Sequence, residues 1–400
     1  MASPYLKAPY AGSPDVPAVA YSLGRPMRVL LGVNPNAGGG KGARYRDALD
    51  QYVRRNGGTS RLPPHIETYH TFETLADSNA RIGHIRETIA QNRPDAVVVA
   101  GGDGTVADFA EAIQDLIEAP RPFLVAGPVG TAFDIARCSG VPQKAAWLFD
   151  WMKWAKPNPL PLAHVRFNGE DTAYPMVHSL SIGLSGEVFA AMEEAKREHP
   201  GLPSWRYLGI LAPRLTHAPS YDLSVNDGAL MRCGEMLCGI VPRMMGTAGV
   251  ALPLPLYGAG LFALPVNDDV RAGFAGSYRR IWPALQPFIE GLWRGLKVAY
   301  VDDSLMRDVT PLTRLSPDRQ FQFPSGSEVH LRITKPGSNG TEPLGIHCAL
   351  DGETMPDVGP VHQVDMDLPV PTLQTLAHRW SYFDMRSSMM ASAALLAAGG

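Results

Sequence analysis

One stretch of the chain, residues 96–109, limits the fold more than any other. It reads AVVVAGGDGTVADF, in which five apolar residues lead directly into a glycine-rich turn and then into an amphipathic pattern. A short run without polar residues is typical of a strand that helices cover on both faces, as in parallel sheets. The sequence therefore predicts an α/β domain built on a parallel sheet.

The turn itself has the composition of an anion site. Its residues are Gly101, Gly102, Asp103, Gly104 and Thr105. Glycines let backbone N–H groups approach a phosphate closely, and the positive end of the following helix dipole attracts the same charge. An ordinary tight turn between a strand and a helix requires neither an aspartate among three glycines nor a threonine after them. We therefore favour a phosphate-binding function for this turn.

Short apolar runs and helical patterns alternate through the first 155 residues. Strands are predicted at 28–33, 65–70, 96–100 and 123–126. The segments between them carry apolar residues at helical spacing, for example Tyr45, Leu49 and Val53. This order is typical of βαβ units, and it predicts a doubly wound parallel sheet.

Two more glycine-rich segments directly follow predicted strands. Residues 34–42 read NPNAGGGKG, and residues 127–131 read GPVGT. Neither segment has the spacing of a P-loop or of a GxGxxG fingerprint. Because the C-terminal ends of parallel strands meet at one edge of a sheet, we expect all three turns to form one ligand site.

From about residue 156, short apolar runs are joined by proline-rich connections. Strands are predicted at 163–168, 221–225, 235–241, 329–333 and 346–350, with one helix at 281–297. This spacing is typical of a β-sandwich. We expect a disordered lead-in at 1–26, an α/β nucleotide-binding domain at 27–155, a β-sandwich domain at 156–370, and a C-terminal helix and tail at 371–400.

The overall composition argues against several classes of function. A formal net charge of −3 over 400 residues gives no basic surface for nucleic acid. The four cysteines form no CxxC pair and have no histidine at zinc spacing, so we expect reduced thiols. Prolines and glycines interrupt the apolar segment 236–266, which argues against a membrane-spanning helix there. We expect a cytoplasmic protein, with contact to a membrane surface left open.

Taken together, the motifs resemble the catalytic domain of the diacylglycerol kinases and sphingosine kinases, soluble lipid kinases distantly related to NAD kinase. The resemblance is carried by NPNAGGGKG, GGDGT, GPVGTAFDIAR and, late in the chain, LDGE, and it covers residues 27–365. It implies transfer of the γ-phosphoryl group of ATP, accompanied by Mg²⁺, to a lipid hydroxyl. The second domain would receive the lipid at a membrane surface, and homodimer formation is left open.

The resemblance also implies roles for individual residues. Asn34 and the turn at 101–105 would hold ATP, with Thr105 near the phosphates. Asp103 would contact Mg²⁺ or the substrate hydroxyl, and Glu353 would accept the hydroxyl proton. Further contacts are implied with the nucleotide at Thr71, Thr131 and Asp351, and with the lipid head group at Glu187. A solvated glutamate at the start of a helix is the alternative interpretation of Glu187.

Three positions depart from the family pattern. Ala107 and Phe133 stand where the family usually has asparagine, and Ala259 stands where the β domain commonly offers a carboxylate to a structural magnesium. We therefore expect no structural magnesium at residues 257–261, so that the only ion is the one accompanying ATP.

These observations lead to one main hypothesis and two alternatives. The main hypothesis is an ATP-dependent kinase acting on a primary hydroxyl of diacylglycerol or of a sphingoid or ceramide-like lipid. A lipid-binding or regulatory relative with weakened catalysis is the first alternative, motivated by the three departures. An NAD kinase is the second, and both the apolar segment 236–266 and the late DGE disfavour it.

Overall fold

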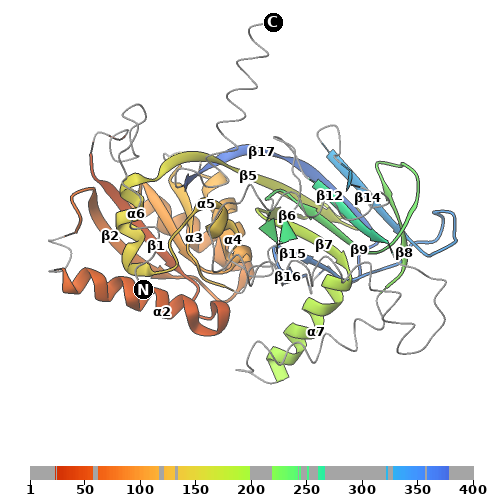
Figure 1. Ribbon diagram of the computed structural model, residues 1–400, viewed down its shortest axis with the longest axis horizontal. Helices are drawn as coiled ribbons and strands as arrows, with labels where there is room; N and C mark the ends of the chain where they lie inside the picture. Colours follow the sequence, from red (N-terminus) through yellow and green to blue (C-terminus); the bar gives the residue numbers. More distant parts are fainter. Residues whose placement is uncertain are drawn as a thin grey trace, which may run out of the picture.

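The structure is a computed structural model, and the part of the chain that it describes forms a mixed α/β fold around one large sheet. The described residues are 23, 25–56, 62–116, 121–130, 134–198, 219–241, 243–244, 250–251, 260–265, 321–322, 328–355 and 358–377. Figure 1 shows most of the helices gathered around the N-terminal half, while strands dominate the rest. The mixed α/β class predicted from the sequence is confirmed.

The first half alternates strands and helices in the predicted order. Its elements are β1 (Met27–Val33), α2 (Ala37–Arg55), β2 (Ile66–Glu73), α3 (Ser78–Asn92), β3 (Ala96–Ala100), α4 (Asp103–Gln114), β4 (Phe123–Ala126), α5 (Asp134–Ser139), the 3-10 turn η3 (Ala145–Trp147) and α6 (Leu148–Trp154). All of β3 is buried, as its apolar sequence requires. In α2 the predicted apolar positions Tyr45, Leu49 and Val53 face the core.

The strands of this half pair in the order β4-β3-β1-β2, and every pair is parallel. From β1 the chain goes first to β2 on one side and then to β3 on the other. In open α/β sheets such a change of direction leaves a crevice at the C-terminal ends of the two strands, where ligands bind. The topology therefore predicts a ligand site beyond Val33 of β1 and Ala100 of β3.

The second half is mainly β. Its elements are β5 (Lys156–Phe167), β6 (Ala173–Met176), β7 (Ser179–Gly183), α7 (Leu184–Glu198), β8 (Tyr221–Val225), β9 (Met231–Gly239), β10 (Arg243–Met244), β11 (Val250–Ala251), β12 (Gly260–Pro265), β13 (Phe321–Gln322), β14 (Glu328–Thr334), β15 (Cys348–Leu350), β16 (Glu353–Thr354) and β17 (Gln363–Ala377). The predicted strands are present, whereas the helix expected at 281–297 falls outside the described residues.

These strands continue the sheet of the first half. Hydrogen bonding runs in the order β16-β15-β7-β9-β8-β14-β17-β4, and β17 also pairs with β5 over most of its length. A β-sandwich that stands apart from the first sheet is thus not confirmed. The division at residues 155 and 156 stays a prediction.

Strand β17 corrects the prediction made for the C-terminus. A helix and tail were expected from residue 371, but the chain continues as a strand to Ala377 and pairs in parallel with β4 through Thr375 and Leu124. Leu373 and Leu376 are buried, so pairing and burial favour the extended conformation there. Residues 378–400 lie outside the described part of the chain.

The four cysteines are buried and form no disulfide bond, in agreement with the reduced thiols expected from the sequence. None of the helices in the described part of the chain is long and apolar enough to cross a membrane.

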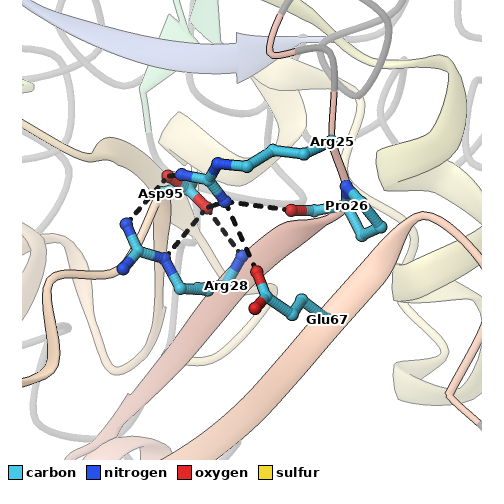
Figure 2. Close-up of polar contacts among 5 residues, drawn as sticks. All are labelled: Arg25, Pro26, Arg28, Glu67 and Asp95. Atoms are coloured by element: carbon cyan, nitrogen blue, oxygen red, sulfur yellow. Dashed lines mark hydrogen bonds and ion pairs between the residues drawn. The ribbon is translucent and has the colours of Figure 1, made fainter.

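Asp95 ties the N-terminal ends of β1 and β3 together, as Figure 2 shows. The guanidinium of Arg25 donates hydrogen bonds of 2.7 and 2.8 Å to the two carboxylate oxygens, and the backbone N–H of Arg28 donates one of 2.8 Å. Burial raises the pKa of Asp95, but the hydrogen bonds from Arg25 and Arg28 outweigh it, so the pKa lies below its usual value. This cluster lies at the end of the sheet opposite the predicted ligand site.

Among the described residues of the second half, Glu235 on β9 is the most deeply buried carboxyl. Its side chain is 0% exposed, and its Oε2 accepts a 2.7 Å hydrogen bond from the backbone N–H of Ser185, in the first turn of α7. Its Oε1 has no hydrogen-bond partner among the described residues. Burial raises the pKa of Glu235 to about 8, although the bonds from Ser185 act in the opposite direction.

We predict that Glu235 makes the fold less stable as the pH rises. Between its unfolded value near 4.5 and its folded value near 8, the folded chain binds a proton that the unfolded chain has released. The free energy of unfolding therefore falls with pH in this window, by up to about 1.4 kcal/mol per pH unit from this group. Glutamine resembles the protonated acid but does not titrate.

Chemical denaturation of Glu235→Gln and of the unaltered chain at several pH values measures this contribution. The stability of the variant relative to the unaltered chain should rise from pH 5 to pH 8 and level off above that. A difference that does not change with pH would show that Glu235 is ionised in the folded protein.

Candidate active site

The three glycine-rich turns meet at the C-terminal edge of the parallel strands, as the sequence predicted. A Cβ atom added to Gly130 would lie 2.9 Å from the Cα of Gly102, and one added to Gly38 would lie 3.3 Å from the Cα of Gly130. Gly38 and Gly130 also have φ values of 57° and 107°, which side chains rarely tolerate. Glycine is therefore required because backbone packs on backbone.

Asn34 fastens the first turn to the second. Its backbone N–H donates to the carbonyl of Ala100 over 3.0 Å, and its side-chain Nδ2 donates to Oγ1 of Thr105 over 3.1 Å. Its Oδ1 accepts the N–H of Asn36, which bends the chain into the first turn. The sequence predicted Asn34 and Thr105 as nucleotide contacts, and the structure places them side by side.

The second turn opens α4 at a glycine. Gly102 is the N-cap of α4 and makes no side-chain capping bond, and the first N–H groups of a helix have no partner within the helix itself. An anion here also meets the positive end of the helix dipole. This end of α4 is therefore suited to hold a phosphate.

The late DGE motif forms the tight hairpin between β15 and β16. Leu350 pairs with Glu353, and the two residues between them, Asp351 and Gly352, both have positive φ, at 49° and 80°. Asp-Gly is a favoured pair for a two-residue hairpin in which both residues are left-handed. The motif therefore specifies a tight turn. Its contribution to the site depends on the side chains that this turn positions, Asp351 and Glu353.

Asp351 holds the chain between β6 and β7. Its carboxylate accepts backbone N–H bonds from Val177, His178 and Ser179 over 2.8 to 3.0 Å, and its own N–H donates to the carbonyl of Ser179. Burial raises the pKa of Asp351 to about 7, although His178 and the backbone bonds favour the ionised form. The observed contacts are structural, and the predicted role in nucleotide binding stays a prediction.

Glu353 faces the second turn from across the site. A Cβ atom added to Gly104 would lie 2.6 Å from Cδ of Glu353, and one added to Gly102 would lie 3.9 Å from its Oε1. The side chain is exposed, so it is open to a substrate from solvent. The structure therefore brings together the two elements that the sequence separated by about 250 residues, the glycine-rich turn and the late carboxylate.

A second group of polar side chains includes Asp103 of the second turn. Asp103, Asp134 and His178 each offer a ligand atom, and these atoms lie within 4.8 Å of one another. Nε2 of His178 is 3.6 Å from Oδ2 of Asp134, and the backbone N–H of Asp134 reaches Oδ2 of Asp103 over 3.4 Å. All three residues are buried, and burial raises the pKa of Asp103. Two carboxylates and an imidazole at this spacing could hold a divalent cation.

The remaining predicted site residues lie apart from this centre or outside the described chain. Thr71 is exposed on the edge strand β2, so β1 separates it from the turn after β3. Glu187 is half-buried in the first turn of α7. This position fits the alternative interpretation, a glutamate at the start of a helix, and the contact with a lipid head group stays a prediction. Thr131 and Phe133 lie outside the described residues, as do residues 257–259 of the segment expected to lack structural magnesium.

Sequence reasoning missed His178 and gave Asp134 no role of its own. His178 lies 44 residues from Asp134 and in no motif. The sequence signal that could have marked Asp134 as a site residue was its position at the start of the helix that follows the third turn. The histidine could only be found through the bonds from Asp351 that bring its segment to the site.

Comparison with known proteins agrees with this geometry. The sequence profile of the diacylglycerol kinase catalytic domain matches residues 28–163. Two solved structures from Bacillus anthracis str. Sterne share the fold. One, described as a candidate diacylglycerol kinase, is 18% identical, with a TM-score of 0.54 over 88% of this chain and 98% of its own. The other, described as a diacylglycerol kinase, is 16% identical, with a TM-score of 0.51 over the same shares.

No curated protein matches the chain by sequence. At 16 and 18% identity the solved structures establish the fold alone. The match of residues 28–163 to the diacylglycerol kinase catalytic domain confirms the family resemblance that the sequence motifs carried.

Proposed function

We propose that this protein is an ATP-dependent lipid kinase, which transfers the γ-phosphoryl group to a primary hydroxyl of diacylglycerol or of a sphingoid or ceramide-like lipid. The observation that carries the proposal is the position of Glu353 against the turn at Gly104. A phosphate cradle that faces a carboxylate is what transfer from a nucleotide to an alcohol requires.

The three turns would bind the phosphates of ATP. Phosphoryl transfer needs little covalent chemistry from the protein, so positioning and charge stabilisation supply most of the rate. The open N-terminus of α4 at Gly102 and the close approach of Gly130 favour an anion held by backbone N–H groups.

A divalent cation would accompany the nucleotide. The buried carboxylates of Asp103 and Asp134 have the chemistry of cation ligands, and a bound cation would offset the cost of burying two negative charges together. The cation would neutralise phosphate charge during transfer. Asp103 begins α4 next to the phosphate turn, so it is suited to link the metal to the turn.

Glu353 would accept the proton of the lipid hydroxyl. An alcohol is a weak nucleophile at neutral pH, and a carboxylate within hydrogen-bond reach makes it a better one. Glu353 comes from the second half of the chain while the phosphate turn belongs to the first, so a lipid held by the β-rich half would meet the nucleotide between them. We accordingly propose residues 156–370 as the lipid-receiving domain, with the protein peripheral at a membrane surface.

The proposal is tested by incubating the protein with labelled ATP and Mg²⁺. Diacylglycerol, sphingosine and ceramide are supplied as acceptors in mixed micelles, and NAD is supplied in a separate reaction. We expect label on one class of lipid and none on NAD. ATP binding without transfer to any lipid would favour the alternative, a relative with weakened catalysis. Ala107, on the buried face of α4, is one of the departures from the family pattern that motivate this alternative. Labelled NAD would instead identify an NAD kinase.

We predict that Glu353→Gln reduces turnover by about 10²-fold or more while ATP affinity stays nearly unchanged, since glutamine cannot accept the proton. Asp103→Asn should weaken both metal-nucleotide binding and turnover. Nucleotide titration and initial rates separate the two effects. The two roles would have to be exchanged if Glu353→Gln kept near-normal turnover and Asp103→Asn lost it with unchanged ATP affinity.

We also predict that Gly104→Ala impairs turnover while making α4 more stable. The new methyl group would occupy the position of the Glu353 carboxyl, which is exposed and can move aside. Alanine in place of glycine favours a helix by up to about 1 kcal/mol. A misplaced carboxylate should lower turnover about tenfold or more.

Gly83→Ala in α3 is the matched control, because nothing lies within 4 Å of its added Cβ. It should leave turnover unchanged. Gly102→Val should instead weaken ATP binding in a folded chain, since its extended backbone admits valine but the side chain enters the phosphate site. Unchanged turnover in Gly104→Ala, or unchanged ATP affinity in Gly102→Val, would contradict the proposed site.

A further inference from the structure

We propose that His178 is a metal ligand, and that the site it forms with Asp103 and Asp134 binds a first-row transition-metal dication in preference to Mg²⁺ and without nucleotide. The inference deepens the proposed function because it concerns the metal of the same site. It depends on the geometry of these three residues, which no motif of the sequence predicted.

The distance between the ligand atoms of His178 and Asp134 is close to that of two ligands on one ion. Nε2 of His178 and Oδ2 of Asp134 are 3.6 Å apart, which is too long for a direct hydrogen bond. Nitrogen and oxygen ligands bind such metals at about 2.0–2.2 Å, so two of them around one ion lie roughly 3–3.5 Å apart. A small contraction around an ion would bring the two atoms into this range.

The imidazole is oriented as metal-binding histidines usually are. Nδ1 of His178 is 3.0 Å from Oγ of Ser179, which can accept its proton, and in that tautomer Nε2 carries the lone pair that a metal ligand needs. The backbone N–H groups of His178 and Ser179 are both bound by Asp351. Both the ring and the segment that carries it are therefore held in place.

Charge balance favours a dication at this position. Asp103, Asp134 and His178 are 7%, 0% and 4% exposed, so the side chains are shielded from bulk water. Two carboxylates beside a neutral imidazole would carry two negative charges, which is the charge that one dication matches. One divalent cation neutralises both.

The donor set decides which metal is favoured. Mg²⁺ prefers oxygen ligands and gives up its water reluctantly, so a buried site with an imidazole nitrogen suits it poorly. Imidazole binds the later first-row dications better, while carboxylates accept Mn²⁺ readily. Mn²⁺ is therefore the probe of choice, because it fits both donor types and has an electron paramagnetic resonance signal.

Such a metal would connect the two halves of the chain. Asp103 and Asp134 start helices α4 and α5 of the first half, and His178 lies between β6 and β7 of the second. Binding to the folded state alone would raise the melting temperature, and tighter binding would raise it further. Metal binding should therefore stabilise the full chain even when no nucleotide is present.

The test uses the full chain, stripped of metal with a chelator and titrated with Mn²⁺ in the absence of nucleotide and lipid. We expect one bound Mn²⁺ per chain, nitrogen modulation in its electron spin echo spectrum, a higher melting temperature, and displacement only by at least tenfold more Mg²⁺. His178→Gln should remove the nitrogen modulation and weaken binding by tenfold or more. His330→Gln, which alters an exposed imidazole paired with Asp365, is the control and should bind as the unaltered chain does.

Binding that requires ATP, a bound Mn²⁺ without nitrogen modulation, or unchanged affinity in His178→Gln would overturn the proposal. If His178→Gln fails to fold, Ser179→Ala provides the second variant, because it only releases the ring and should weaken Mn²⁺ binding several-fold. Unchanged affinity in Ser179→Ala, with no nitrogen signal in the unaltered chain, would equally refute it. Since no lipid or nucleotide is present, the result is independent of whether the protein phosphorylates a lipid.

Discussion

The close approach of three backbone turns is the constraint on which the site depends. Gly130 lies so near Gly102, and Gly38 so near Gly130, that a side chain at either position would meet the neighbouring backbone. The three turns therefore pack backbone on backbone at the edge of the sheet, where the strand order changes direction. A site built in this way can hold phosphate with little sequence specificity beyond its glycines, which explains why the glycine-rich turns are its strongest sequence signal.

The second half of the chain positions its candidate functional side chains through the hairpin between β15 and β16. Asp351 occupies a left-handed position in a two-residue hairpin, and its carboxylate binds the segment that carries His178. The same hairpin directs Glu353 to the turn at Gly104. One tight turn thus positions both a candidate proton acceptor and a candidate metal ligand, and strands β17 and β5 join this half to the first sheet.

The sequence allowed the elements of the first half, and the meeting of its three glycine-rich turns, to be predicted. The strands at 96–100 and 123–126 agree with β3 and β4, because buried apolar runs next to glycine are unambiguous. The convergence of the turns also followed from parallel pairing. Helix α7 was anticipated only through the alternative interpretation of Glu187 as a glutamate at a helix start. Strand β17 was missed because it contains prolines at 369 and 371. His178 could not be found because its role depends on bonds to residues far along the chain.

The central claim is that the phosphate turn and Glu353 form one active site, and a crystal structure with a non-hydrolysable ATP analogue and a divalent cation tests it most directly. The account predicts the triphosphate against the turn at Gly102, with the γ-phosphate facing Glu353 at a separation that one lipid hydroxyl can bridge, at most roughly 6 Å or two hydrogen bonds. A nucleotide bound away from the three turns, or a γ-phosphate directed away from Glu353, would contradict it.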